Sequence, residues 1–276
     1  MEWKKPAARG LLKFTPKTSG GYLPQFFNHL TSMPDSFRGV FTLASSPYPS
    51  TVVPETPCVN HTQRTGLHPM IKLHHLNKSR SRRIIWLVEE IGQPYSVIPY
   101  QRDKTTSLAP PELTQIHPLG KSPVIEIDDI VLPESGAITE YLIERYAPDR
   151  LAPARDSKSF AEYLYWIHFA ESSAMLPLLL KLFLDKDGTE TRFLQGYAQS
   201  EIGKVIGHLE RSLEGKDYLV DNRLTGADIM ISFILDFLQR SGAMAKYPNI
   251  QRYQAVLEKH AGYQAALESE AKYNAE

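Results

Sequence analysis

Residues 119–138 read LGKSPVIEIDDIVLPESGAI, and this stretch carries the features that decide the fold. Two short apolar runs, at 124–127 and 130–132, flank a pair of aspartates at 128–129. Two such runs separated by a two-residue turn are typical of an antiparallel β-hairpin. We therefore predict a hairpin here, followed by a helix over residues 135–146.

Each strand of this hairpin has an irregular end. The first strand opens on the Ser122–Pro123 bond, and proline has no N–H group to donate to a sheet. The second strand runs directly into Glu134 and Ser135, a carboxylate and a hydroxyl at the start of a helix. An ordinary edge strand and an ordinary helix start would also explain these residues. Our interpretation is that both irregular ends hold the backbone of a small peptide ligand.

The sequence before the hairpin predicts a βαβ unit. Residues 71–76 and 95–100 read as strands, and the segment between them reads as a helix that ends at Gly92. The apolar face of this helix consists of Ile84, Leu87, Val88 and Ile91. A short helix is expected over residues 110–117. One β-α-β crossover implies a parallel pair of strands, and the hairpin adds an antiparallel edge.

The sequence after a linker at 148–155 is predicted to be helical throughout. The expected helices span 157–184, 191–213 and 225–238, with a further helix opening at Pro248. Pro177 is expected to kink the first of them. Thr225 and Asp228 have the spacing of a capping box, which satisfies backbone N–H groups at a helix start.

The chain thus divides into parts of different character. Residues 1–69 contain three acidic residues, are rich in Pro, Ser, Thr and Gly, and show no sustained periodicity, which predicts a disordered extension. An organelle-targeting segment, or a stretch upstream of a true start at Met70, are the alternatives. An α/β domain is predicted over residues 70–147 and an all-helical domain over residues 156–276.

The composition is that of a globular protein, with 42% hydrophobic and 22% charged residues. Because 31 basic residues balance 31 acidic ones, the charge does not favour a nucleic-acid partner. No apolar run reaches the roughly 18 residues that would suggest a membrane span. Cys58 is the single cysteine, which excludes an intrachain disulfide and favours a reducing, cytoplasmic location.

The end of the first predicted strand is a candidate site for chemistry. Ser79 lies where that strand gives way to a helix, and a helix N-terminus favours an anion through its unpaired N–H groups and its dipole. The Ser79 hydroxyl could donate a hydrogen bond to a thiolate bound there. Serine is also a preferred helix N-cap, and this structural role would explain Ser79 without any ligand.

Two clusters near this strand are expected to be structural. His74 and His75 are neighbours on a strand, so their side chains point to opposite faces and cannot form a two-histidine metal site. Arg80, Arg82 and Arg83 form a basic patch, for which we expect a solvated face or a subunit contact. No metal is expected in this protein.

The order and spacing of these segments resemble the glutathione transferase family. The resemblance rests on LNKS at 76–79, GKSP at 120–123, ESGAI at 134–138 and, in the helical half, TGAD at 225–228. It covers residues 70–266 and implies a thioredoxin-like α/β domain followed by an all-helical bundle. The first turn has neither Tyr nor Cys, so the chain looks like a Ser-type member of a fungal or bacterial subgroup.

The resemblance implies a role for each matching residue. Ser79 would hold the glutathione sulfur as a thiolate, with Asn77 as a possible alternative donor. The backbone of Ser122, with its geometry set by Pro123, would pair with the cysteinyl unit. The other implied contacts are Lys121 with the glycine carboxylate, and Glu134 and Ser135 with the γ-glutamyl ammonium and carboxylate.

Further parts of the site follow from the same resemblance. His117 stands where Asn is usual in the family and is a possible contact of glutathione. Trp166, Phe169 and Ser173, on the first long helix, are candidates for lining the pocket of the electrophile. Aromatic residues at such a spacing are also typical of a helix core.

The implied activity is conjugation of glutathione, as co-substrate, to a small apolar electrophile. This would be a detoxification reaction of a cytoplasmic homodimer, with no nucleic-acid, membrane or metal partner. Glutathione-dependent reduction of peroxides in the same site is one alternative. A non-catalytic glutathione-binding or regulatory module is another, because a fold does not guarantee an activity.

Overall fold

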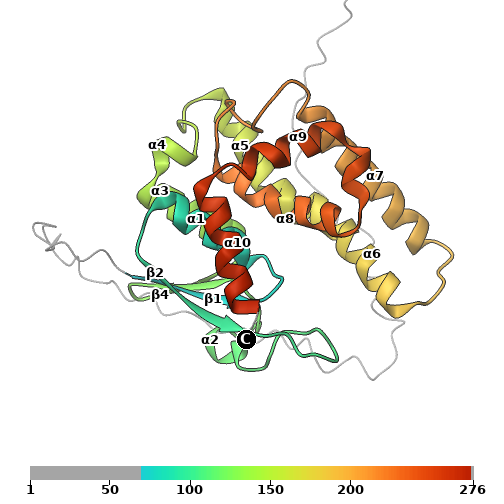
Figure 1. The fold of residues 1–276 in the computed structure, drawn as a ribbon, viewed down its shortest axis with the longest axis horizontal. Helices are drawn as coiled ribbons and strands as arrows, with labels where there is room; N and C mark the ends of the chain where they lie inside the picture. The colour runs from blue at the N-terminus through green and yellow to red at the C-terminus, as the bar shows by residue number, and fades with distance from the viewer. Residues whose placement is uncertain (1–69, 275–276) are drawn as a thin grey trace, which may run out of the picture. The chain divides into compact units, whose positions relative to one another are not determined.

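The computed structural model describes residues 70–274. The predicted N-terminal extension over residues 1–69, with its Cys58, lies outside the described residues. Within the described part, a four-stranded sheet with helices precedes a helical half, which is the order predicted from the sequence (Figure 1).

The sheet joins the βαβ unit to the hairpin. Its strands are β1 (Ile71–Leu76), β2 (Tyr95–Tyr100), β3 (Val124–Ile127) and β4 (Ile130–Pro133), in the order β2-β1-β3-β4. β1 and β2 are parallel, with Ile71 opposite Tyr95, whereas β1–β3 and β3–β4 are antiparallel. The predicted strand positions are therefore confirmed, including the two-residue turn of the hairpin.

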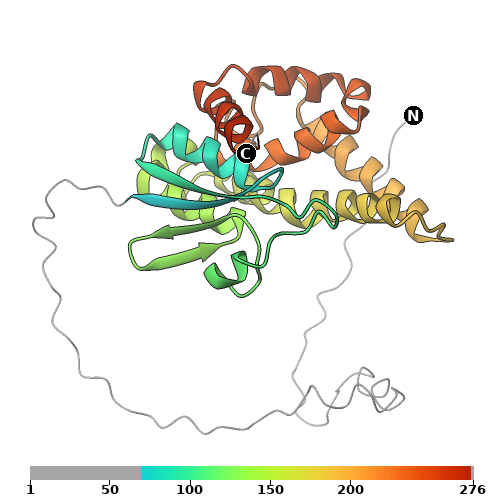
Figure 2. The same cartoon turned by 60° about the horizontal axis from the view of Figure 1, so that its bottom comes forward.

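Three helices accompany the sheet: α1 (Ser81–Ile91), α2 (Leu113–Ile116) and α3 (Ser135–Tyr146). α1 packs against both β1 and α3, and α2 lies on the side of the sheet away from α1 (Figure 2). Ile84, Leu87 and Val88 are fully buried, as their helical spacing predicts. α1 ends at Gly92, whose φ of 75° is a left-handed conformation that glycine adopts without steric cost.

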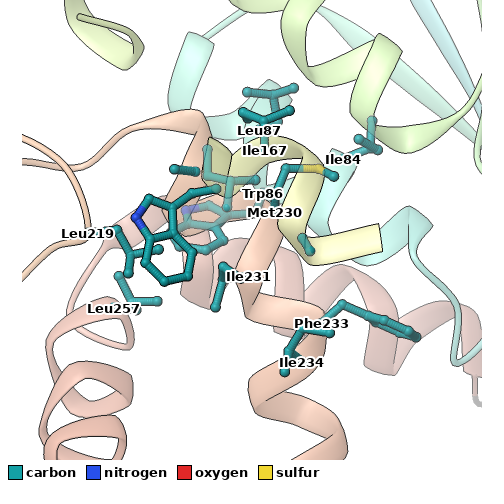
Figure 3. Packing of buried hydrophobic residues seen from close by; sticks show 14 of the residues in the cluster. Ile84, Trp86, Leu87, Ile167, Leu219, Met230, Ile231, Phe233, Ile234 and Leu257 are labelled. Carbon is teal, nitrogen blue, oxygen red and sulfur yellow. The ribbon is translucent and has the colours of Figure 1, made fainter. Parts of the chain in front are cut away.

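The helical half is built around one buried helix. Its helices are α4 (Pro148–Leu151), α5 (Lys158–Phe169), α6 (Met175–Asp187), α7 (Leu194–Ser212), α8 (Gly226–Arg240), α9 (Pro248–Leu257) and α10 (Ala261–Asn274). α8 is almost wholly buried and contacts α1, α3 and α5. Figure 3 shows members of the resulting cluster, namely Ile84, Trp86 and Leu87 of α1, Ile167 of α5, and Met230, Ile231 and Ile234 of α8. One hydrophobic core therefore joins the two halves.

The long helix expected over 157–184 is interrupted earlier than predicted. A π-helical segment, Ala170–Ala174, separates α5 from α6, whereas the sequence predicted a kink at Pro177. Proline removes one hydrogen bond and clashes with the carbonyl four residues before it, here that of Ser173. The disturbance therefore falls in the turn before Pro177. The predicted linker also differs, because it contains the short helix α4.

By length and composition, the helical stretch Lys158–Asp187 is apolar enough to cross a membrane. Charged residues scattered along the stretch interrupt its apolar runs, so the sequence pattern did not predict it. Its most apolar window has a mean hydropathy of 1.4 and is 39% buried in the protein. Core helices of water-soluble proteins pass the same test, so this stretch is weak evidence for a membrane span.

The start of α8 is held by the predicted capping box. The Asp228 carboxylate accepts hydrogen bonds from the N–H groups of Thr225 (2.8 Å) and Leu219 (3.0 Å), and from the hydroxyl of Tyr253 (2.7 Å). The Thr225 side chain accepts from the backbone of Asp228 in return. Because Asp228 is fully buried, these donors have no access to water as a substitute partner.

We expect Asp228→Ala to lower the free energy of unfolding by roughly 3 kcal/mol or more, because it leaves several buried donors unsatisfied. Urea unfolding at neutral pH measures this change. The matched control is Asp217→Ala, which removes an exposed pair with Arg252 and should cost about 1 kcal/mol or less. Equal losses in the two variants would contradict the role assigned to Asp228.

A buried hydrogen-bond chain fixes the turn from β1 to α1. The Oγ of Ser81 lies 2.8 Å from Nδ1 of His75 and 2.7 Å from Oγ of Ser79. His75 is fully buried, and its Nε2 has no hydrogen-bond partner within residues 70–274. Burial lowers the pKa of His75 from 6.5 to about 4, because the charged ring would lose its hydration.

The unfolded chain therefore binds a proton at His75 more readily than the folded chain does. The resulting stability is complete above pH 6.5 and is lost as the pH falls to about 4. We expect a contribution of about 3 kcal/mol over this interval. His75→Asn should flatten the dependence of the unfolding free energy on pH, whereas the exposed-site control His168→Asn should not. Unchanged slopes in both variants would contradict this assignment.

Candidate functional site

A cavity of about 240 Å³ opens where β3 and α3 begin. Its walls come from the tip of α1, the loop before β3, the end of β4, the start of α3 and the π-helical segment. The lining residues are Arg80, His117, Leu119, Lys121, Ser122, Pro123, Pro133, Glu134, Ser135 and Glu171. The structure thus brings together the predicted glutathione contacts of both irregular hairpin ends, along with His117.

Ser122 presents its backbone, rather than its side chain, at the cavity. Its hydroxyl donates to the carbonyl of His74 (2.8 Å) and accepts from the N–H of Leu76 (3.1 Å), so the side chain is turned to β1. The Ser122–Pro123 peptide bond is cis. Backbone groups at a cavity, here just before β3, can pair with an extended peptide as an additional strand would.

Glu134 has an unusual backbone conformation at the start of α3. Its φ of 68° lies in the left-handed region, which side chains other than glycine and asparagine rarely adopt. Its carbonyl nevertheless accepts the first helical hydrogen bond, from Ile138 (2.8 Å). A conformation of this kind costs about 1–3 kcal/mol and is concentrated at functional sites. At this position Glu134 lines the cavity.

Ser135 is oriented by a buried arginine behind the cavity wall. Arg83 is 2% exposed, and its Nη2 donates to the hydroxyl oxygen of Ser135 and to the carboxylate of Glu171. Its Nη1 donates to the carbonyl of Met230 (2.8 Å). Burial lowers the pKa of the Arg83 guanidinium, and the charge of Glu171 opposes this. Because the Ser135 oxygen accepts from Arg83, its own hydrogen can donate to a ligand in the cavity.

The basic patch does not form the solvated face that the sequence predicted. Arg82 pairs with Asp236 and, at 3.5 Å, with Glu270, while Arg80 and Arg83 both pair with Glu171. All three acids come from the helical half, far along the chain, so sequence spacing could not reveal them. The patch instead forms an ionic contact between the two halves of the chain.

The predicted thiolate-binding residues lie beside the cavity rather than on its wall. Ser79 is 5% exposed, and its hydroxyl contacts the hydroxyl and the N–H of Ser81. The side-chain oxygen of Asn77 accepts from the N–H of Arg102 (2.9 Å). The residue of this turn that lines the cavity is Arg80. The role of Ser79 therefore stays a prediction, and it requires that the hydroxyl exchange its partner.

The candidate lining of the electrophile pocket is placed elsewhere. Trp166 and Phe169 are buried in the hydrophobic core, where the Trp166 ring stacks on His208 at 5.4 Å between centroids. Ser173 is exposed. None of the three lines this cavity, and the two aromatic residues belong to the core, which fits the alternative explanation of their spacing. Their part in an electrophile pocket stays a prediction.

The sequence analysis did not predict the charged cavity residues Arg80 and Glu171, nor the apolar lining residues Leu119 and Pro133. Arg80 was grouped with the basic patch, and Glu171 stands in a stretch predicted to be ordinary helix. The sequence feature that pointed to an irregular helix near Glu171 was Pro177, because a proline disturbs the helical turn that precedes it. π-helical segments frequently occur at functional sites, because they turn a side chain out of the regular helical path.

Both halves of the chain match descriptions of one known protein family. The family description "Glutathione S-transferase, N-terminal domain" matches residues 68–144, and "Glutathione S-transferase, C-terminal domain" matches residues 174–260. Glutathione S-transferase 1 of Saccharomyces cerevisiae is 30% identical over 223 residues, which cover 72% of this chain and 95% of that protein. A shorter match, to elongation factor 1-gamma-B of Xenopus laevis, is 30% identical over 138 residues and covers 29% of that protein.

Solved structures show the same relationship. The glutathione S-transferase of Actinobacillus pleuropneumoniae superposes with a TM-score of 0.68 at 38% identity. That superposition covers 73% of this chain and 93% of the other. The thioredoxin-like half with its helical partner, and the sequence matches across both, show that the chain belongs to the glutathione S-transferase family.

Proposed function

We propose that this protein is a glutathione transferase that binds glutathione in the cavity and transfers it to a small apolar electrophile. The observation that carries the proposal is the set of groups that line one cavity. They include the lysine Lys121, the residue Ser122 just before β3, and a carboxylate beside a hydroxyl at Glu134 and Ser135. Glutathione carries groups that complement this set: a carboxylate, a peptide backbone, and an ammonium beside a second carboxylate.

Each group of the tripeptide then has a partner of complementary chemistry. Lys121 meets the glycine carboxylate in a charge-assisted contact, and the backbone of Ser122 pairs with the cysteinyl unit. Glu134 accepts from the γ-glutamyl ammonium. The Ser135 hydroxyl donates to the γ-glutamyl carboxylate, and Arg83 behind it supplies positive charge.

The cysteinyl sulfur then faces the N-terminal end of α1, whose unpaired N–H groups and dipole favour an anion. The S–H bond breaks and its proton leaves to water. With an aryl halide as acceptor, the thiolate forms a C–S bond, the C–halogen bond breaks, and the halide leaves. The protein contributes thiolate stabilisation and positioning to this reaction. Ser79 is the proposed hydrogen-bond donor to the sulfur.

Detoxification by a cytoplasmic homodimer remains part of this proposal, as do the alternatives. Peroxide reduction would use the same thiolate with a hydroperoxide as acceptor. The partial match to elongation factor 1-gamma-B favours a binding or regulatory module as the second candidate. Purified full-length chain assayed with glutathione and halides, epoxides, enals and hydroperoxides separates these functions. Retention on immobilised glutathione without turnover of any acceptor would favour the binding module.

We expect Glu134→Gln to weaken glutathione binding about 10- to 100-fold, because it removes a charged hydrogen bond while keeping the size of the side chain. Isothermal titration calorimetry measures the dissociation constant. Glu144→Gln, at an exposed position paired with Arg155, is the control and should bind as the wild type does. Wild-type affinity in the Glu134 variant would refute the placement of the ammonium.

We expect Ser79→Ala to lower the conjugation rate with little change in glutathione affinity, because a hydrogen bond to the sulfur matters most for the thiolate. Steady-state kinetics with an aromatic halide separates kcat from KM. Ser172→Ala, which removes a solvent-exposed hydroxyl bonded to His168, controls for loss of a serine. Full activity of the Ser79 variant would remove this residue from the mechanism.

A further inference from the structure

Arg80 occupies a position in the cavity that the proposed glutathione contacts leave unexplained. It is the residue immediately before α1 and lines the same cavity as Ser122. Its Nε donates to a carboxylate oxygen of Glu171 at 2.7 Å, and its guanidinium carbon lies 5.4 Å from the centre of the Phe233 ring. The side chain is 27% exposed, so it is held by the helical half but still reaches solvent.

Most of the hydrogen-bond donors of Arg80 have no partner within residues 70–274. A guanidinium has five N–H donors, and Arg80 uses the one on Nε for Glu171. No acceptor for either Nη group is found in the described part of the chain. Arg83 differs in this respect, because its Nη groups donate hydrogen bonds to Ser135, Glu171 and Met230. Arg80 therefore offers both charge and donors to a ligand.

The groups of glutathione point to the same assignment. Under the proposed function, Lys121 takes the glycine carboxylate, and Ser135 with Arg83 takes the γ-glutamyl carboxylate. The sulfur is the remaining group that can become an anion, and Arg80 is the remaining cationic side chain among the arginines and lysines of the cavity wall.

We propose that Arg80 is a catalytic residue whose guanidinium directly contacts the glutathione sulfur and holds it as the thiolate. This inference rests on the proposed function and deepens it. A cysteine thiol is mostly protonated at neutral pH, and a cation within a few ångströms favours the anion. Glu171 holds the guanidinium in place, and the N-terminal end of α1 adds positive potential to the same point.

The buried state of Ser79 agrees with this arrangement. Its hydroxyl is part of the chain through Ser81 to His75, which fixes the backbone at the first turn of α1. A fixed backbone there determines where the neighbouring Arg80 side chain begins. Ser79 thus positions Arg80 in the ligand-free protein, in addition to any contact with the sulfur that its hydroxyl makes after exchanging partners.

The test compares Arg80→Gln and Arg80→Lys with the wild type and with Arg155→Gln. Arg155 pairs with Glu144 at an exposed position outside the cavity, so its variant removes the same charge elsewhere. The first measurement is the pKa of the bound glutathione thiol, from the ultraviolet absorption of the thiolate. The second is the dependence of kcat/KM on pH. The third is the affinity for S-methylglutathione, which has no ionisable thiol.

We expect Arg80→Gln to raise the bound thiol pKa by about one unit, so that kcat/KM falls about tenfold at neutral pH and recovers at higher pH. Arg80→Lys should restore part of the effect, because it keeps the charge but not the planar fork of donors. Binding of S-methylglutathione should stay at the wild-type value in both variants. Arg155→Gln should match the wild type in all three measurements.

Two outcomes would overturn the inference. An unchanged thiol pKa in both Arg80 variants would leave Arg80 without a role at the sulfur. A loss of S-methylglutathione affinity without a pKa shift would place Arg80 at a carboxylate of the tripeptide. Failure of the proposed function is distinguishable from failure of this inference. In that case the wild type itself would neither bind glutathione nor show a thiolate absorption band. If Arg80→Gln does not fold, Arg80→Lys decides the question by the same measurements.

Discussion

The buried guanidinium of Arg83 is the interaction on which the arrangement of the site depends. An unpaired buried charge costs several kcal/mol, so Arg83 needs partners. Its Nη groups find them in Ser135 at the start of α3, Glu171 in the π-helical segment and the Met230 carbonyl of α8, whereas its buried Nε has no partner within residues 70–274. One side chain on α1 thereby fixes the relative positions of three elements from both halves. The cavity lies between two of these elements, so its shape follows from satisfying this one charge.

The fold was largely predictable because its determinants are local. The bounds of β1, β2 and α3 follow from alternation, helical periodicity and the residues that end each element. The capping box at Thr225 and Asp228 likewise needs only a four-residue pattern. The irregular turn before Pro177 was misplaced because proline acts on the carbonyl four residues earlier, so its effect appears in the preceding turn. The arginine pairs were unpredictable from spacing, since their carboxylates stand far away along the chain.

The candidate site also contains residues that local sequence patterns predict and residues that only tertiary packing brings together. Lys121, Ser122, Glu134 and Ser135 lie at the two ends of one hairpin, so the strand pairing that the sequence predicts also brings them together. Arg80 and Glu171 meet only because the helical half packs on α1, and no local pattern encodes that contact. The left-handed backbone of Glu134 was equally hidden, because its residue type argues against such a conformation. The sequence thus predicts the wall to which we assign the tripeptide backbone but not the wall to which we assign the sulfur.

The different placement of Ser79 and Arg80 follows from the hydrogen bonds of the turn before α1. Ser79 is buried in this turn, whereas Arg80, the residue immediately before α1, lines the cavity. The hydrogen bonds of Ser81 to Ser79 and to His75 favour the orientation in which the serine faces the protein and the arginine faces the ligand. A hydroxyl is satisfied by this buried chain, whereas a guanidinium with unused donors is better placed at a wet cavity. In the ligand-free protein the turn before α1 therefore presents charge to the cavity, and a contact of the Ser79 hydroxyl with a sulfur requires that this hydroxyl exchange its partner.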